Sequence, residues 1–172
     1  SIAERAGGIR FLSRIVGPFF SKLFPEVPKG HPAHGHIMMN FSANMLGLDN
    51  AATPFGIKAM ESLQELNPKK DTASNAQIMF LCLHAAGLAL IPTSVIAVRA
   101  VTVGINGTKA ANPTDIFIPC LVATFAATMA ALLIVSFKQK IKLLQPVILG
   151  WVLGISAIIA LLVFFISGLN TV

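Results

Sequence analysis

Two long, uncharged apolar runs in the second half of the chain constrain its fold more than any other feature. They are Ile116–Phe137 and Val147–Leu169. A helix needs about 20 apolar residues to cross the roughly 30 Å hydrocarbon core of a bilayer, so each run is long enough to span it. The segment between them carries three lysines within residues 138–142. We therefore predict a transmembrane helical hairpin whose basic turn lies in the cytoplasm.

The composition also indicates that lipid is a second solvent for this chain. Of its 172 residues, 55% are hydrophobic and only 12% are charged, whereas about 25% of residues are charged in an ordinary soluble domain. The formal net charge is +6. Because the basic residues lie between apolar runs, orientation in a membrane explains them better than nucleic-acid binding. We expect the lipid bilayer, and not nucleic acid, to be a partner.

Two further apolar segments are interrupted. Ala76–Val103 contains Pro92, which removes a backbone donor and frees a carbonyl one turn earlier. His36–Leu48 is too short to cross the membrane and leads toward Pro54. Backbone polar groups in lipid must be satisfied within the protein. We therefore predict a kinked span and a re-entrant half-helix, with structural breaks at Pro92 and Pro54.

Two segments are amphipathic rather than uniformly apolar. In Phe55–Thr72, apolar residues recur at helical spacing opposite charged residues, which is typical of a helix at the water interface. Residues 1–30 mix basic and apolar side chains, as does a helix lying on an anionic leaflet. The expected fold is all-α: a polytopic helical membrane protein with broken or re-entrant helices and an amphipathic interfacial N-terminal helix. Its expected parts are residues 1–30, a membrane domain at 31–137, and a basic loop with a C-terminal transmembrane helix at 138–172.

Polar side chains gather around the two interruptions. Asn40 and Asn44 are four residues apart, so on a helix they share a face. Amide and hydroxyl groups at membrane depth must bond to each other, to broken backbone or to a solute. Six residues are expected to bind such a solute: Asn40, Asn44, Asn50, Thr53, Thr93 and Ser94. The same pattern also fits residues that only hold the broken helices together.

Ionisable groups near the interruptions are few. Arg99 either extends to the interface, as long basic side chains do near helix ends, or forms a charge pair with Asp49. His84 fits a packed, neutral histidine better than a ligand. The histidines within residues 31–36 lack cysteine or acidic neighbours, so we expect no metal site. Nucleotide-binding, hydrolase and metalloprotease motifs are absent, so we expect neither an enzyme nor a cofactor.

Two motifs keep the order and spacing of a known family. They are NxxANxLGxxNAATPxGxKAM, which begins at Asn40, and IPTxxIAxRA, which begins at Ile91. They resemble the spore maturation protein A group of the nucleoside-recognition, or Gate, domain membrane proteins, and the resemblance covers about residues 23–137. The resemblance implies that residues 31–137 form a Gate-type membrane domain. It also implies a multi-pass protein of the bacterial inner membrane that is related to the gate region of concentrative nucleoside transporters.

Two functions follow as hypotheses. In the first, the chain transports a small polar, nucleoside-like solute. In the alternative, it is a structural or accessory subunit of a membrane complex. One chain with three or four apolar segments can hardly enclose a polar pathway by itself. We therefore expect a homo-oligomer or, as the resemblance implies, a companion Gate-domain subunit like spore maturation protein B. The solute and any coupling ion stay open.

Overall fold

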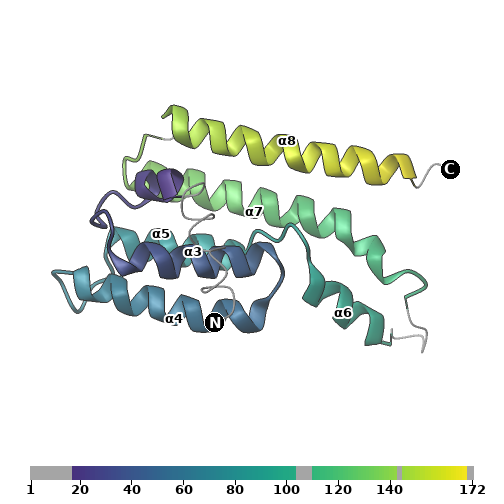
Figure 1. Ribbon diagram of the computed structural model, residues 1–172, viewed down its shortest axis with the longest axis horizontal. Coiled ribbons are helices and arrows are strands. Elements are labelled where there is room, and N and C mark those ends of the chain that lie inside the picture. Colours follow the sequence, from purple (N-terminus) through teal and green to yellow (C-terminus); the bar gives the residue numbers. More distant parts are fainter. Residues whose placement is uncertain (1–16, 104–109, 143–144, 170–172) are drawn as a thin grey trace.

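The chain folds into a bundle of helices. The structure, a computed structural model, describes residues 17–103, 110–142 and 145–169, and among these no segment forms a strand. A short helix at residues 17–23 comes first. The later elements are α3 (Pro32–Met45), α4 (Asp49–Leu66), α5 (Asn75–Ala86), α6 (Thr93–Val101), the 3₁₀ turn η1 (Pro113–Ile116), α7 (Phe117–Lys138) and α8 (Pro146–Leu169). The all-α prediction is confirmed (Figure 1).

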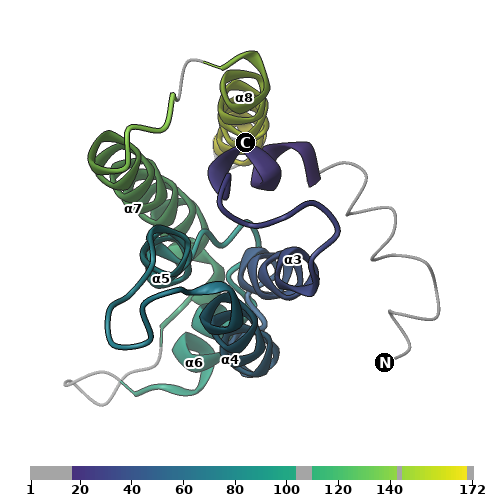
Figure 2. The same ribbon diagram turned by 90° about the vertical axis from the view of Figure 1, so that its left-hand side faces the viewer.

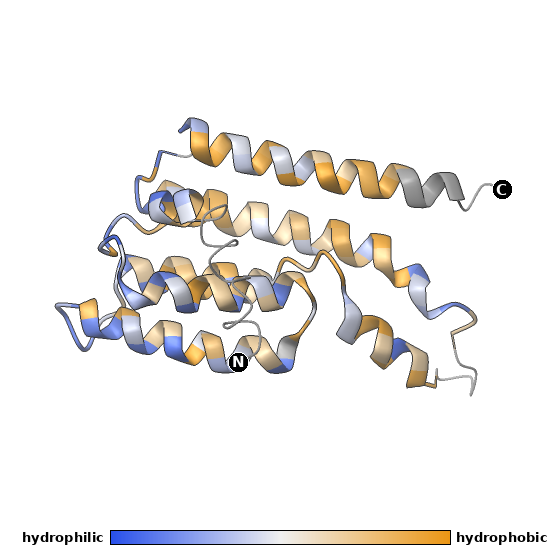
Figure 3. Ribbon diagram, in the orientation of Figure 1, coloured by the Kyte–Doolittle hydropathy of each residue, from blue (hydrophilic) through white to orange (hydrophobic). Residues whose placement is uncertain are grey.

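The two helices α7 and α8 match the predicted apolar runs. In the described part of the chain they are the two helices long and apolar enough to cross a membrane, over Pro113–Lys138 and Pro146–Phe164. Only 22% and 11% of their apolar windows are buried inside the protein, whereas the core helix of a soluble protein is mostly buried. Hydrophobic residues predominate along both helices where they are coloured (Figure 3). Lipid is the solvent that suits this surface.

The axes of the other long helices run in directions similar to those of α7 and α8. Seen from one end, α3, α4, α5, α7 and α8 appear nearly end-on, so their axes run in similar directions (Figures 1 and 2). The most extensive packing is that of α3 on α4 and of α5 on α7. The α4 helix was expected to be a separate surface helix starting at Phe55. It is instead a full member of the bundle.

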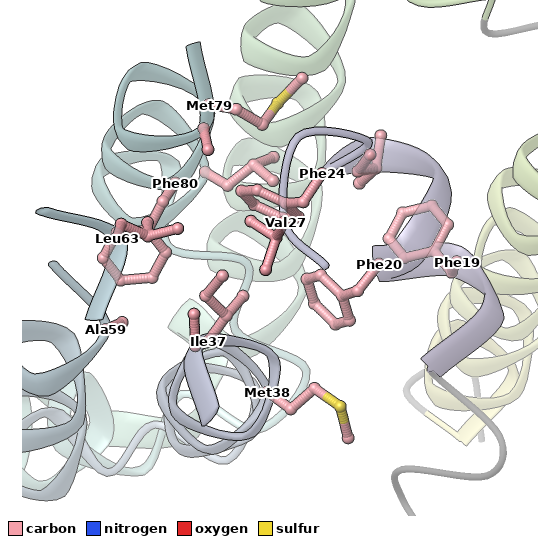
Figure 4. Packing of buried hydrophobic residues seen from close by; sticks show 14 of the residues in the cluster. Phe19, Phe20, Phe24, Val27, Ile37, Met38, Ala59, Leu63, Met79 and Phe80 are labelled. Atoms are coloured by element: carbon pink, nitrogen blue, oxygen red, sulfur yellow. The ribbon is translucent and has the colours of Figure 1, made fainter. Parts of the chain in front are cut away.

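The N-terminal segment packs into the core of this bundle. Phe20 is 1% exposed, and its ring meets that of Phe41 edge-on, with ring centroids 5.4 Å apart. Phe19 contacts Trp151 of α8, with centroids 5.7 Å apart. Figure 4 shows Phe19, Phe20 and Phe24 in the cluster that also holds Ile37 and Met79. The apolar side of this segment is therefore covered by protein. Residues 1–16 lie outside the described residues, so their interfacial placement stays a prediction.

The first interruption is not at the residue that the sequence suggested. Pro54 was predicted to break the chain, but it lies inside α4. The chain turns instead at Gly47, whose φ is +64°, a left-handed conformation that glycine adopts without strain. Gly47 N donates to Asn44 O and Leu48 N donates to Ala43 O, both at 2.9 Å. This pattern satisfies the last carbonyls of α3, which is why the helix ends there.

The second interruption lies next to the predicted proline. The expected span Ala76–Val103 is divided into α5 and α6 by residues 87–92, and Pro92 is the residue that precedes α6. The α5 helix ends on Gly87, which has a φ of +54°. Two helix–break–helix units, α3–α4 and α5–α6, thus follow each other along the chain.

Candidate functional site

The two interruptions are hydrogen-bonded to each other. Leu90 N and Ile91 N both donate to Met45 O, at 2.9 and 3.1 Å. The backbones approach so closely that a Cβ added to Gly47 would lie 2.4 Å from Ile91 O and 2.7 Å from Thr93 N. Only glycine fits at this position. We call this contact between the two interruptions the crossing. It fixes where α4 and α6 begin.

The hydroxyls of the second interruption bond to the first one. Thr93 Oγ1 donates to Gly47 O at 2.9 Å and to Leu46 O at 3.2 Å. Ser94 Oγ donates to Gly47 O at 2.5 Å. These two expected solute ligands thus give their protons to the free carbonyls at the end of α3. Their oxygens keep lone pairs that can accept a hydrogen bond.

A second polar cluster joins α3, α4 and α5. Asn40, which is 1% exposed, donates from Nδ2 to Ala52 O at 2.7 Å. Its Oδ1 therefore acts as the acceptor and lies 3.0 Å from Nδ1 of His84. Asn44 Nδ2 lies 3.5 Å from the same Oδ1 and 3.3 Å from the ring nitrogen. The two asparagines do share a face, and that face points at α5.

The histidine of this cluster was not among the expected site residues. Because Asn40 Oδ1 can only accept, its 3.0 Å contact requires a proton on Nδ1 of His84, and the longer 3.3 Å approach of the donor Asn44 Nδ2 to that nitrogen is then not a hydrogen bond. Phe80 stacks on the imidazole, with ring centroids 5.8 Å apart. A Cβ at Gly56 would lie 3.0 Å from Asn40 Nδ2. The cluster is closely packed, and its half-buried members are Asn44 and His84.

The two remaining expected ligands lie elsewhere. Asn50 and Thr53 are exposed on the outer side of α4, apart from the buried Asn40. Lys58, Glu61 and Glu65 follow on the same helix and are exposed too. Figure 3 shows hydrophilic colour along α4, which runs in a direction similar to that of α7, with α5 between the two helices. We call these five residues the polar face of α4, and Ile57, which is 56% exposed, lies among them.

The proposed charge pair is not decided by the structure. Arg99 is half-buried on α6, and within the described residues its Nε is buried without a hydrogen-bond partner. Asp49 is the first residue of α4. The side chain of Asp49 lies outside what the structure describes, so its pairing with Arg99 stays a prediction.

The histidines before α3 have structural contacts. His31 precedes the helix, and its Nδ1 accepts a hydrogen bond from Ala33 N at 3.2 Å. His36 Nδ1 lies 3.0 Å from the buried Ser62 Oγ, which ties α3 to α4. In the described ranges, no three His, Cys, Asp or Glu side chains come together in a group that could hold a metal ion.

Comparison with known families identifies the group to which this arrangement belongs. The family model described as "Gate: Nucleoside recognition" matches residues 1–102, more than half of the chain. The chain belongs to the Gate family. The match contains both interruptions and the cluster around Asn40, whereas α7 and α8 lie beyond it.

A curated relative points to the same group. The chain is 45% identical over 133 residues to "Spore maturation protein A" of Bacillus subtilis (strain 168). The alignment covers 77% of this chain and 65% of the relative, so the chain spans slightly less than two thirds of the relative's length. No solved structure matches the chain. The predicted resemblance to Gate and spore maturation proteins is confirmed.

Proposed function

We propose that this Gate-family protein forms part of a transmembrane pathway for a small polar solute of nucleoside-like size. In this proposal it is a multi-pass protein of the bacterial inner membrane, with α3 and α5 as half-helices that enter the bilayer without crossing it. The observation that supports the proposal most is the polar face of α4. This face runs along the same direction as the two apolar helices α7 and α8 (Figure 1).

If α4 lies within the bilayer alongside the apolar helices, its charged side chains do not suit contact with lipid. Lys58 lies about 12 Å along the helix from the end of α4, at a rise of 1.5 Å per residue. A lysine or carboxylate at the bilayer centre costs roughly 2.5–3.5 kcal/mol on insertion scales. Lys58 and Glu61 are both exposed on the bundle. They are accommodated best if the polar face of α4 contacts water or a second protein.

The helix ends at the crossing support a solute site. The α4 and α6 helices both begin there, after Leu48 and Pro92, and neither has a side-chain cap. Helix N-termini carry partial positive charge and free N–H groups. Paired interrupted helices whose ends meet inside the membrane form the binding sites of repeat-built transporters. The amides of Asn44 and Asn50 add polar groups to α3 and α4.

A second chain would complete such a pathway. In the described residues, the polar face of α4 lies on the outside of the bundle and no other helix covers it. We propose that a companion Gate-domain subunit, like spore maturation protein B, or a second copy of this chain covers that face. We propose no enzymatic activity and no cofactor. Transport requires only that the paired surfaces admit water and solute.

A specific observation favours the alternative, in which the chain is an accessory subunit of a membrane complex. The hydroxyl protons of Thr93 and Ser94 are already committed to Gly47 O. Those two residues therefore stabilise the crossing whether or not a solute binds. In this alternative, the polar face of α4 is a docking surface alone.

Uptake into proteoliposomes separates the two functions. The full-length protein with its partner is reconstituted, and uptake of labelled nucleosides is measured for the wild type and for Asn44→Ala and Asn50→Ala. We expect uptake by the wild type. We expect about tenfold less uptake by each variant, the equivalent of one lost hydrogen bond of roughly 1.4 kcal/mol.

The control for this experiment is Asp71→Asn, which alters an exposed residue in the connection between α4 and α5. Its uptake should equal that of the wild type. Absence of uptake from a folded, partner-complete sample would contradict the transport proposal. Normal uptake by both variants would also contradict the roles given to the two asparagines. If the two asparagine variants dissociate from the partner but take up solute as the wild type does, the accessory function is favoured.

A further inference from the structure

A pocket of about 510 Å³ opens where the α4–α5 connection meets the turn before α3. Its size falls within the range of small-molecule sites, roughly 300–1,000 Å³. One side is apolar, formed by Val27, Leu63, Leu66 and Ala76. The polar groups on its wall come from Glu26, Asn67, Lys69, Thr72, Ser74 and Asn75. None of the residues expected from the sequence to bind solute lines this pocket.

Buried amides hold the walls of the pocket in place. Asn67, which is 4% exposed, donates from Nδ2 to Thr72 O at 2.7 Å and to Gln77 Oε1 at 3.0 Å. Gln77 Oε1 also accepts from Ser74 N at 2.8 Å, and Ser74 Oγ accepts from Gln77 N. This reciprocal capping box fixes the start of α5. The pocket is therefore formed before any ligand binds.

The pocket lies at the end of the bundle where α7 finishes and α8 begins. Gln139 Nε2, just after α7, donates to Asn75 O at 2.8 Å. If α7 crosses the bilayer, this contact places the pocket at the level of the lipid headgroups. Figure 2 views the molecule from this end. Exposed lysines lie in the segments that meet here: Lys69 and Lys70 in the α4–α5 connection, and Lys138 and Lys140 beside Gln139.

The pocket carries one charge of each sign. The Glu26 carboxylate is positioned by Asn75, whose Nδ2 donates to Oε1 at 2.7 Å. Two neighbouring lysines have different roles. Lys70 Nζ donates to Gln64 O at 2.7 Å and so caps the end of α4, whereas Lys69 lines the pocket. An acidic group and a basic group beside an apolar wall complement a zwitterion with an apolar end.

We propose that this pocket binds a phosphoethanolamine group, as found in the headgroup of phosphatidylethanolamine. The primary ammonium would donate to the Glu26 carboxylate, the phosphate would accept from Lys69, and the glycerol end would lie against the apolar wall. A choline headgroup has no N–H to donate, and phosphatidylglycerol has no cation for Glu26. The inference depends on the membrane placement of α7 and α8 and not on solute transport.

Native mass spectrometry of the full-length complex tests this site. The wild type is incubated with equal amounts of phosphatidylethanolamine, phosphatidylcholine and phosphatidylglycerol, and retained lipid is quantified. We expect preferential retention of phosphatidylethanolamine. Glu26→Gln and Lys69→Gln should each weaken it about tenfold, because each removes one charge-assisted hydrogen bond. Asp115→Asn and Lys142→Gln make the same charge changes at exposed positions outside the pocket and should retain the lipid as the wild type does.

Three further results of the lipid-binding experiment test the phosphoethanolamine proposal. Competition by millimolar soluble phosphoethanolamine would support the proposal, because it would show that the headgroup is the part recognised. Equal retention of the three lipids, or a preference for phosphatidylglycerol, would overturn the proposal. Loss of binding in Asp115→Asn or Lys142→Gln to the same extent would overturn it too, since it would indicate a general charge effect. Nucleoside uptake is measured separately, so failure of one proposal leaves the other unaffected.

Discussion

Replacement of Gly47 by alanine should lower the midpoint of thermal unfolding by about 10 °C. A Cβ at this position would lie 2.4 Å from Ile91 O, and the residue has a φ of +64°. The left-handed conformation costs an alanine about 1–2 kcal/mol, and the overlap costs roughly 1–3 kcal/mol more. A loss of about 3 kcal/mol corresponds to such a shift in a chain of this size. Unfolding can be followed with a thiol-reactive dye that detects exposure of Cys82 and Cys120, both half-buried free thiols.

Two other glycines separate the causes of this effect. Gly30 has a φ of +82° but nothing within 4 Å of an added Cβ, so Gly30→Ala should show the conformational cost alone, about 3 °C. Gly35 lies in α3 with free space and an ordinary φ, so Gly35→Ala should raise the midpoint by about 2 °C, because alanine favours a helix by about 0.5–1 kcal/mol over glycine. Equal midpoints for all three variants would show that the crossing of the two interruptions contributes nothing to stability.

Replacement of Asn40 by alanine should lower the free energy of unfolding by about 2 kcal/mol. The substitution removes the 2.7 Å bond to Ala52 O and the acceptor for His84. Hydrogen bonds between helices in membranes contribute about 0.6 kcal/mol each on average, and the unpaired buried groups add to the loss. The expected change in the unfolding midpoint is about 6 °C. Asn40→Asp should be at least as destabilising, because a carboxylate cannot donate to Ala52 O.

The matched control is Asn50→Ala. Asn50 is exposed on α4 and has no part in the buried cluster, so its replacement should change the free energy of unfolding by less than about 0.5 kcal/mol. The proposed function assigns Asn50 an effect on uptake only. A large loss of stability in this variant, or none in Asn40→Ala, would contradict the division between buried and exposed amides.

The helices that the sequence predicted best are those with one dominant physical signal. The α7 and α8 helices follow from the length of uncharged apolar runs. The interruption beside Pro92 follows from a missing backbone donor. The first interruption was placed at Pro54 because proline is the usual helix breaker, but α4 continues through Pro54, its sixth residue. The chain turns at Gly47, where the fit to Ile91 requires glycine, and this requirement is visible only in three dimensions.

The candidate site could be predicted only in part, for a similar reason. The four-residue spacing of Asn40 and Asn44 correctly indicated a shared face. Their partner His84 is 44 residues beyond Asn40 and 40 beyond Asn44, and nothing in its local sequence connects it to them. The amphipathic pattern of α4 predicted a helix with one polar face. The pattern contains no information on whether that helix lies along the membrane surface or beside the spans.

Spin-label accessibility measures directly whether the polar face of α4 is shielded from lipid, as the proposed function requires. A label is placed at Lys58→Cys in a chain whose Cys82 and Cys120 are replaced by alanine, reconstituted in bilayers with its partner. The control is Ala130→Cys on α7, which is exposed and lies as many residues before the end of its helix. We predict much lower collision with oxygen, which concentrates in lipid, at position 58 than at 130. Equal oxygen collision at both positions would place Lys58 in lipid and contradict the account.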